Sequence, residues 1–234
     1  MLSAGDDTVQ TVGSTVFFLR RRKLDKEQFD YNKDVIKVFI PTPRLISIFE
    51  EQRCKAGNHR ALELFQALSS HALTRTATGW RHEMEVHRRL CTDGAALHIS
   101  RSDVTMEILP STNLLPGTVS GLKQVSQGDT FYWMPSSSNF PGVDSVLGSM
   151  VDNELAIFTI QATIANDHTS PAEGITKVWR NFLPKIRAGC TWHYVVVANT
   201  NQAAQRFVEH FSEELKGFRL DRNRKPVQVW ACSL

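Results

Sequence analysis

The chain has 234 residues, of which 41% are hydrophobic and 22% are charged, which is the composition of an ordinary globular protein. Lysine and arginine number 27 against 24 for aspartate and glutamate, so the formal net charge is only +3 at pH 7. This small excess excludes the histone-like class of strongly basic proteins that bind nucleic acid through charge alone.

No membrane anchor, secretory signal or cysteine motif is recognisable in the sequence. The longest apolar runs, at 16–19 and 194–198, are too short to span a bilayer, and residues 1–10 are acidic and polar. No Cys-x-x-Cys pair occurs, which favours reduced, buried thiols over a zinc site or a disulfide framework. We expect a nuclear or cytoplasmic protein with no signal peptide, no transmembrane segment and no membrane partner.

The N-terminal part combines a short apolar run, the basic run 20–23 and a strand-like stretch at 35–40. Four basic residues could act as a nuclear-import signal, although such a run is more often a solvated surface. We expect residues 1–40 to be an N-terminal segment, a possible remnant of an upstream domain, and residues 41–234 to form the main domain.

Three helices are expected at the start of this domain. Apolar residues recur at helical spacing in 45–49 and again in 62–68. A third helix should begin near Thr78, whose hydroxyl can cap free amides, and should end at Asp93 and Gly94.

The pattern then changes to strands and later to alternating strands and helices. Short β-like pieces are expected at 96–100, 104–109, 119–125 and 130–133. The strongest strand, which should be central, is 155–163. A helix at about 172–183, a strand at 192–198, a helix bearing Phe207 to Leu215 and a strand at 227–230 should follow. The expected fold class is α/β, with helices on both faces of a mixed sheet.

Polar residues at three places suggest a metal site. Glu83 lies on the third helix, Asp144 follows a turn-rich stretch, and alternation along a strand puts Gln161 and Thr163 on one face. If Glu83, Asp144 and Gln161 meet at one sheet edge, their hard oxygen atoms suit Mg²⁺ or Mn²⁺. An aspartate beside such a turn is also often a cap or an Asx-turn residue, so both interpretations stay open.

Three runs of the sequence carry a resemblance to a known family. They are Gly79-Trp80-Arg81-His82-Glu83 with His87 and Leu90, then Tyr132-Trp133-Met134-Pro135-Ser136 with Asn139-Phe140-Pro141 and Asp144, then Phe158-Thr159-Ile160-Gln161-Ala162-Thr163 with His168. In this order they resemble the C-terminal nuclease-like domain of Crinkler effectors and retrotransposon-hot-spot proteins, within the PD-(D/E)XK restriction-endonuclease-like superfamily. The resemblance covers about 75–200, and 41–74 more loosely.

The resemblance implies a restriction-endonuclease-like three-layer core and magnesium-dependent endonuclease activity on DNA. Glu83 would be the helical acid of the family and Asp144 its hairpin acid. Gln161 and Thr163 occupy the outer places of the acid-x-lysine motif on the strand. Crinkler proteins generally carry a P-loop NTPase upstream, so the resemblance implies two partners: nucleic acid, with DNA expected, and an upstream NTPase module or partner chain.

The strand motif departs from the family pattern. Gln161 is neutral and offers a metal only its carbonyl oxygen, and Thr163 supplies no cation. Lys177 on the following helix, or Lys185 beyond it, could replace the lysine. The alternative is that these lysines belong to a basic stripe that is solvated or contacts phosphates.

Two other functions therefore stay open. One is a nuclease fold that no longer cuts and acts as a nucleic-acid-binding or protein-binding effector. The other is an interaction module whose polar clusters are caps and turns. A zinc site on the helix is rejected, because His82 and His87 are five residues apart and do not share a helix face. His87 could instead orient Glu83 or be a satisfied core residue.

Overall fold

The computed structural model describes residues 18–21, 36–39, 62, 77–92, 95–136, 140–164, 170–220 and 226–234. The chain divides into two compact units, Met1–Thr76 and Ala77–Leu234. In the first unit, β1 (Phe18–Arg21) and β2 (Ile36–Phe39) pair as an antiparallel ladder.

The strand β2 confirms the strand expected at 35–40, whereas β1 includes residues of the basic run that had no predicted element. Apart from the helical residue Leu62, the helices expected in 41–74 lie outside the described residues. The expected division into residues 1–40 and 41–234 stays a prediction.

The second unit is built around a mixed sheet of seven strands. In chain order its elements are α4 (Ala77–Cys91), β3 (Leu97–Arg101), β4 (Val104–Ile108), the 3-10 helix η1 (Val119–Gln124), β5 (Phe131–Trp133), β6 (Ser145–Val151), β7 (Glu154–Thr163), α5 (Ala172–Asn181), α6 (Pro184–Ala188), β8 (Cys190–Ala198), α7 (Asn201–Glu214) and β9 (Gln228–Ser233). The strand order is β4-β3-β9-β8-β7-β6-β5. Strands β7, β8 and β9 are parallel, and the other neighbouring pairs are antiparallel.

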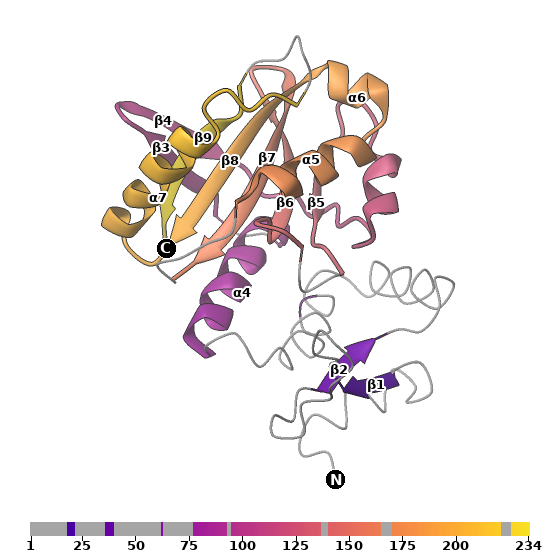
Figure 1. Ribbon diagram of the computed structural model, residues 1–234. Coiled ribbons are helices and arrows are strands. Elements are labelled where there is room, and N and C mark those ends of the chain that lie inside the picture. Colours follow the sequence, from indigo (N-terminus) through magenta and orange to yellow (C-terminus); the bar gives the residue numbers. More distant parts are fainter. Residues whose placement is uncertain are drawn as a thin grey trace. The chain divides into compact units, whose positions relative to one another are not determined.

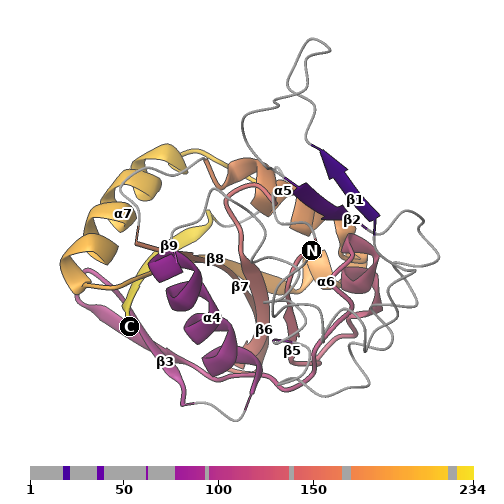
Figure 2. The ribbon, with the colours of Figure 1, turned by 90° about the horizontal axis from the view of Figure 1, so that it is seen from below.

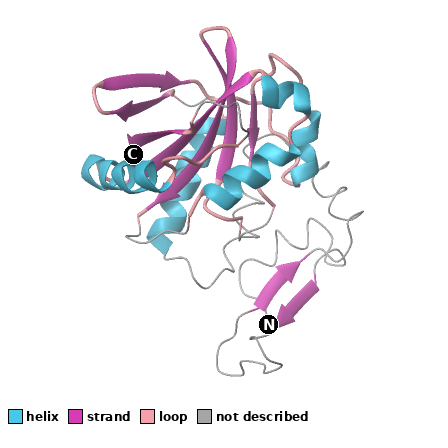
Figure 3. Ribbon diagram, turned by 45° about the horizontal axis from the view of Figure 1, so that its top comes forward, coloured by secondary structure: helices cyan, strands magenta, loops and turns pink. Residues whose placement is uncertain are grey.

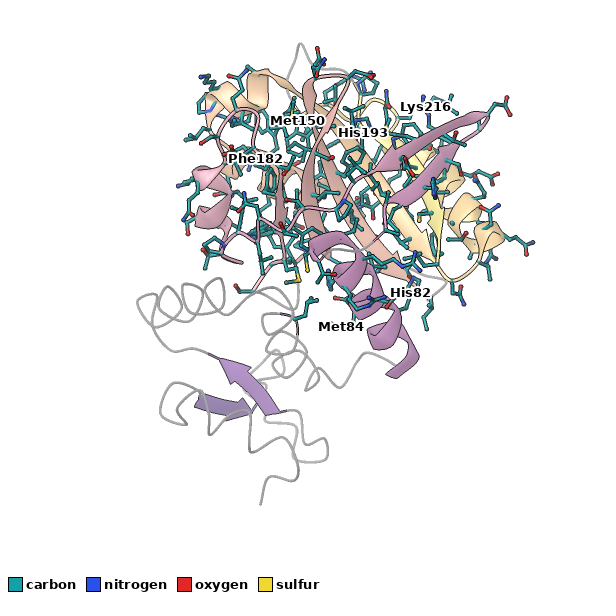
Figure 4. The ribbon with its side chains drawn as sticks, turned by 180° about the vertical axis from the view of Figure 1, so that it is seen from behind. His82, Met84, Met150, Phe182, His193 and Lys216 are labelled. Carbon is teal, nitrogen blue, oxygen red and sulfur yellow. The ribbon has the colours of Figure 1, made fainter. Side chains whose placement is uncertain are left out.

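Helices cover both faces of this sheet, as expected. In Figure 1, α5 and α7 lie in front of the sheet, whereas Figure 4, seen from behind, shows α4 in front of it. Figure 2 shows β8 and β9 running between α4 and α7, and Figure 3 shows the same helices in cyan around the magenta strands. The unit is therefore an α/β structure of three layers. Among the described residues, no helix is both long and apolar enough to cross a membrane.

The interior strands are buried because helices pack on both sides of them. Residues 192–198 of β8 are all buried, which explains the nearly continuous apolar run of this strand. Alternate residues of β7 and β8 point to the α5 and α7 layer, where Ile157, Tyr194 and Val196 join the main core. Phe158 and His193, one residue out of phase, belong to the α4 side of the sheet.

The structure also corrects the sequence-based predictions. The strand expected at 119–125 is wrong, because residues 119–124 form η1, and Leu122 within it and Val125 directly after it are buried at a spacing of three. Gly121 allows this turn to close on Pro116, whose carbonyl oxygen would overlap a Cβ atom there. The strand β6 had no prediction, since Gly148 interrupts its apolar pattern and leaves room for the ring of Phe131.

The buried imidazole of His193 is held in its neutral form by its hydrogen bonds. Trp230 donates its indole N–H to His193 Nδ1 at 3.0 Å, so that nitrogen must carry a lone pair. The Thr191 hydroxyl lies 3.0 Å from Nε2 and can accept its proton. Burial, assisted by the charge of Arg101, lowers the pKa of His193 to about 4.

This depressed pKa predicts that acid weakens the fold. The pKa of folded His193 is below the ordinary value of 6.5, so its contribution to stability is complete above pH 6.5 and declines as the pH falls toward 4. Urea unfolding should show a loss from this residue of about 2 kcal/mol between pH 8 and pH 5.

The control for this prediction is His210→Gln, which changes an exposed histidine on α7. His193→Gln should reduce the dependence of the unfolding free energy on pH, and His210→Gln should not. An unchanged pH dependence in His193→Gln would contradict the assignment.

Candidate functional site

The candidate site lies at the sheet edge where β7 and β8 end and β6 begins. Asp144 directly precedes β6, and its backbone N–H donates to the Ile160 carbonyl at 2.8 Å. The Asp144 carboxylate in turn accepts the backbone N–H of Ala162 at 2.9 Å through Oδ2. Because Ser145 lies opposite Ile160, this register brings Asp144 beside Gln161. Two of the predicted site residues are thus brought together.

Gln161 is buried beside a tyrosine of the next strand. Its side chain is 7% exposed, and the hydroxyl of Tyr194 lies within hydrogen-bond distance of Gln161 Oε1. The same hydroxyl lies 3.2 Å from the carbonyl oxygen of Gly142, in the loop before Asp144. Burial, with the negative charge of Asp144 adding to it, raises the pKa of Tyr194 well above its ordinary value. The phenol therefore keeps its proton and remains a hydrogen-bond donor.

The helix α4 contacts the same strand ends through His82. His82 Nε2 lies 3.0 Å from the carbonyl oxygen of Val197, and Val197 is opposite Ala162 in the β7–β8 ladder. The N-terminal half of α4 therefore packs over the ends of these two strands, and Figure 4 shows His82 projecting from this helix. Glu83 follows His82 and is only 5% exposed.

Glu83 belongs to a buried polar cluster with His87 and Tyr132. His87 Nε2 lies 3.5 Å from Glu83 Oε1, and His87 Nδ1 lies 2.7 Å from the Tyr132 hydroxyl. His87 and Tyr132 are fully buried. The sequence left open whether His87 orients Glu83 or is a satisfied core residue, and the contacts fit both descriptions.

Tyr132 is a buried phenol whose pKa is raised by burial and by the charges of Glu83 and Asp144. Burial raises its pKa well above the ordinary value, and the charges of Cys91, Asp144 and Glu83 add to this rise. Glu83 thus lies in the α4 layer, whereas Gln161 points to the opposite, α5 and α7, side of the sheet.

Thr163 stands in the place of the lysine of the acid-x-lysine motif, and Lys177 and Lys185 were considered as its replacements. The three residues lie in different surroundings. Thr163 is buried at the end of β7, opposite Ala198. Lys177 on α5 is exposed, and its Nζ lies 4.8 Å from the centre of the Phe140 ring, in a cation-π contact. Lys185 is exposed on α6, which leads into the opposite end of β8. Lys177 is thus the better placed of the two lysines, while His168 and Asn139 lie outside the described residues.

The ligand atoms that these residues offer are of the chemical type that a hard divalent cation prefers. Glu83 and Asp144 offer carboxylate oxygens and Gln161 an amide oxygen, as Mg²⁺ and Mn²⁺ prefer. One oxygen of Asp144, Oδ2, accepts the Ala162 amide. Among the residues that the structure describes, no three His, Cys, Asp or Glu side chains form a metal-binding group, so a three-ligand site depends on Gln161.

Sequence reasoning missed the two tyrosines and His82 as parts of this site. Tyr194 lies in an apolar run that was expected to be a buried strand. A buried phenol needs a hydrogen-bond partner, so its hydroxyl could have indicated a polar neighbour in the core. Tyr132 stood in one of the runs that carry the family resemblance, but its contact with His87 spans 45 positions of the chain. His82 was considered as a zinc ligand and stood in a run that carries the family resemblance, but it was given no role in the site.

The chain was compared with protein-family models, with curated proteins and with solved structures, and none of the three comparisons found a match. Function is therefore proposed from the geometry of the sheet edge together with the sequence runs described above.

Tight packing of the loop before Asp144 against α5 leads to a testable prediction. A Cβ atom at Gly174 would overlap the carbonyl oxygen of Pro141 and lie 3.0 Å from Val143 Cγ2. Gly174→Ala must therefore displace the loop or the helix, and it should destabilise the unit by about 1–3 kcal/mol in urea unfolding.

Gly189→Ala is the matched control. Gly189 has φ of −107°, which alanine can adopt, and a Cβ atom there would meet the nearest heavy atom at 3.7 Å. This variant should leave the free energy of unfolding nearly unchanged. Equal stability of the two variants would show that the loop does not pack on α5 as described.

Proposed function

We propose that this protein is a metal-dependent nuclease that hydrolyses phosphodiester bonds of DNA on a restriction-endonuclease-like core. The observation that carries the proposal is the meeting of Asp144 and Gln161 where β6 begins and β7 ends, with Glu83 on the helix α4 that packs on these strand ends through His82. All three side chains offer oxygen atoms, and two of them offer negative charge to a divalent cation.

The type of each element supports the same proposal. The resemblance assigns one acid to a helix, one to a hairpin and the acid-x-lysine motif to a strand. Glu83 lies on α4, Asp144 precedes the first strand of the β6–β7 hairpin, and Gln161 lies near the end of β7. The α/β arrangement of three layers is compatible with a restriction-endonuclease-like core.

A bound Mg²⁺ or Mn²⁺ would polarise the scissile phosphodiester and lower the pKa of an attacking water. Asp144 and Glu83 would hold this cation, and Gln161 would contribute its amide oxygen. Thr163 can donate a hydrogen bond but carries no positive charge, so Lys177 is the proposed source of the charge that stabilises the phosphate. Its side chain would have to leave the ring of Phe140 for this role.

Replacing the two acids by their amides tests the proposal. Asp144→Asn and Glu83→Gln keep the size of each side chain but remove its charge. Each should lower the rate of plasmid cleavage with Mg²⁺ or Mn²⁺ by at least about a hundredfold. Gel electrophoresis of supercoiled plasmid over time measures the rate.

Two acids outside the site provide matched controls. Asp152→Asn changes an exposed turn residue at φ of 51°, a conformation that asparagine tolerates. Glu85→Gln changes the acid on α4 that pairs with Arg88 and Arg89 at the surface. Both should cleave at the unmodified rate, and cleavage that persists in Asp144→Asn would overturn the proposal.

A second candidate function is a nuclease fold that binds nucleic acid or a partner chain without cutting. The observation that favours it is Thr163 in the place of the motif lysine, together with the contact of Lys177 with Phe140. The exposed side chains of Lys177, Arg180 and Lys185 on α5 and α6 could contact phosphates without reading sequence. Binding that weakens steeply with salt and is not followed by cleavage is expected in this case.

Removal of the basic stripe tests this second function. The triple variant Lys177→Ala, Arg180→Ala and Lys185→Ala should lower the slope of log affinity against log salt by roughly 2–3, since each phosphate contact contributes about 0.9. Fluorescence anisotropy with labelled duplex DNA measures it. Lys216→Ala, a surface lysine paired with Glu213, is the control. An unchanged slope in the triple variant would exclude the stripe as the binding surface.

A further inference from the structure

The helices α5 and α6 carry positive charge that no acid of the described chain neutralises. Residues 172–189 contain one acid, Glu173, and four basic side chains, which are Lys177, Arg180, Lys185 and Arg187. None of these four forms an ion pair with a residue that the structure describes. On α4 and after α7, by contrast, Arg88 and Lys216 are paired with glutamates. The charge of α5 and α6 can therefore act on an anion outside the chain.

The guanidinium group of Arg187 is held by an aromatic ring. Its Cζ lies 4.6 Å from the centre of the Trp179 ring, so α6 packs on the end of α5 through this cation-π contact. Figure 1 shows the two helices following each other along one side of the sheet. Arg187 and Trp179 are both half-buried, and Arg187 Nε is buried without a hydrogen-bond partner. The ring thus restricts a side chain that is otherwise flexible.

The contact with the ring leaves the hydrogen-bond donors of Arg187 unused. A guanidinium group has five N–H donors, which point outward in its plane. Within the described part of the chain, no acceptor bonds to those of Arg187. A phosphate group offers oxygen acceptors whose spacing matches this planar fork, and an arginine held in advance loses less conformational entropy when it binds one.

We propose that Arg187, positioned by the Trp179 ring, binds a phosphate of the DNA backbone beside α6. This inference rests on the proposed action on DNA. Four basic side chains within one short segment suit a ligand with repeated negative charge, such as a nucleic-acid backbone, better than a single small anion.

The place of Arg187 in the fold indicates what this contact contributes. The helix α6 leads into the start of β8, whereas Gln161 lies opposite Val196, near the end of β8. The nine residues of β8 extend about 25–30 Å. A phosphate bound by Arg187 is therefore remote from the candidate metal site, and the contact contributes to DNA affinity rather than to the chemical step.

DNA affinity measured by fluorescence anisotropy in the presence of EDTA tests this inference without any cleavage. Arg187→Lys keeps the charge but removes the planar fork, so the affinity for labelled duplex DNA should fall by about fivefold. The slope of log affinity against log salt should stay the same, because the number of cations is unchanged. Arg187→Ala removes the charge as well and should lower this slope by about 0.9.

Arg180→Lys is the matched control. Arg180 is exposed on the same segment, and no ring contact joins it to the described residues. This variant should change the affinity for DNA by less than about twofold, because a solvated lysine can replace a solvated arginine as a point charge. A loss as large as that of Arg187→Lys would overturn the special role of Arg187.

Trp179→Leu tests the positioning role of the ring. It should weaken DNA binding about as much as Arg187→Lys, and in an Arg187→Ala background it should cause no further loss, because no guanidinium remains to be held. An equal loss in both backgrounds would show that the indole contacts DNA itself and would overturn the positioning role. Thermal unfolding shows whether each variant is folded. If Trp179→Leu does not fold, the comparison of Arg187→Lys with Arg180→Lys decides the inference.

The outcomes separate this inference from the proposed function. Absence of DNA binding by the unmodified chain would overturn the action on DNA, and the inference with it. Binding that falls in Arg187→Lys but is never followed by plasmid cleavage would overturn the nuclease function and still support the inference. Polyglutamate that binds as tightly as DNA, with the same dependence on Arg187, would assign the contact to an acidic protein partner and overturn the assignment to DNA.

Discussion

The hydrogen bond that the Ala162 amide donates to the Asp144 carboxylate joins the start of β6 to the end of β7. The register of this strand pair also determines which face each residue of β7 occupies. A slip of one residue in the pairing of β7 with β6 would turn the Gln161 side chain to the α4 face. It would also take the Ala162 amide away from the Asp144 carboxylate. The candidate site thus depends on the same backbone pairing that holds the sheet together.

Two buried tyrosines approach this edge from opposite sides of the sheet. Tyr132 lies on the α4 side, where it contacts His87 next to Glu83, and Tyr194 lies on the α7 side, next to Gln161. The charge of Asp144 acts on both. Such buried polar contacts stabilise a structure only when their partners are in place, so they favour one arrangement of the edge over others.

The predictability of the elements followed the strength of their local patterns. The helix α4, the strand β7 and the β8–α7–β9 succession were predicted from runs with one consistent period. The segment 119–125 was assigned the wrong structure: its apolar residues Val119, Leu122 and Val125 recur every three residues, which fits the 3-10 turn that closes on Pro116. The strand β6 could not be predicted from its own pattern, because Gly148 leaves room for the ring of Phe131 on β5, a contact between two strands.

The amino-acid sequence by itself determined which chemical groups are available: two acids, one amide and no lysine at the strand motif. It also indicated an α/β fold, because periodicity is a local property. Only the tertiary structure decided that Asp144 meets Ala162, that Tyr194 meets Gln161 and that Tyr132 meets His87. These contacts join residues 18, 33 and 45 positions apart. Their formation depends on strand order and layer packing, which no short stretch of sequence encodes.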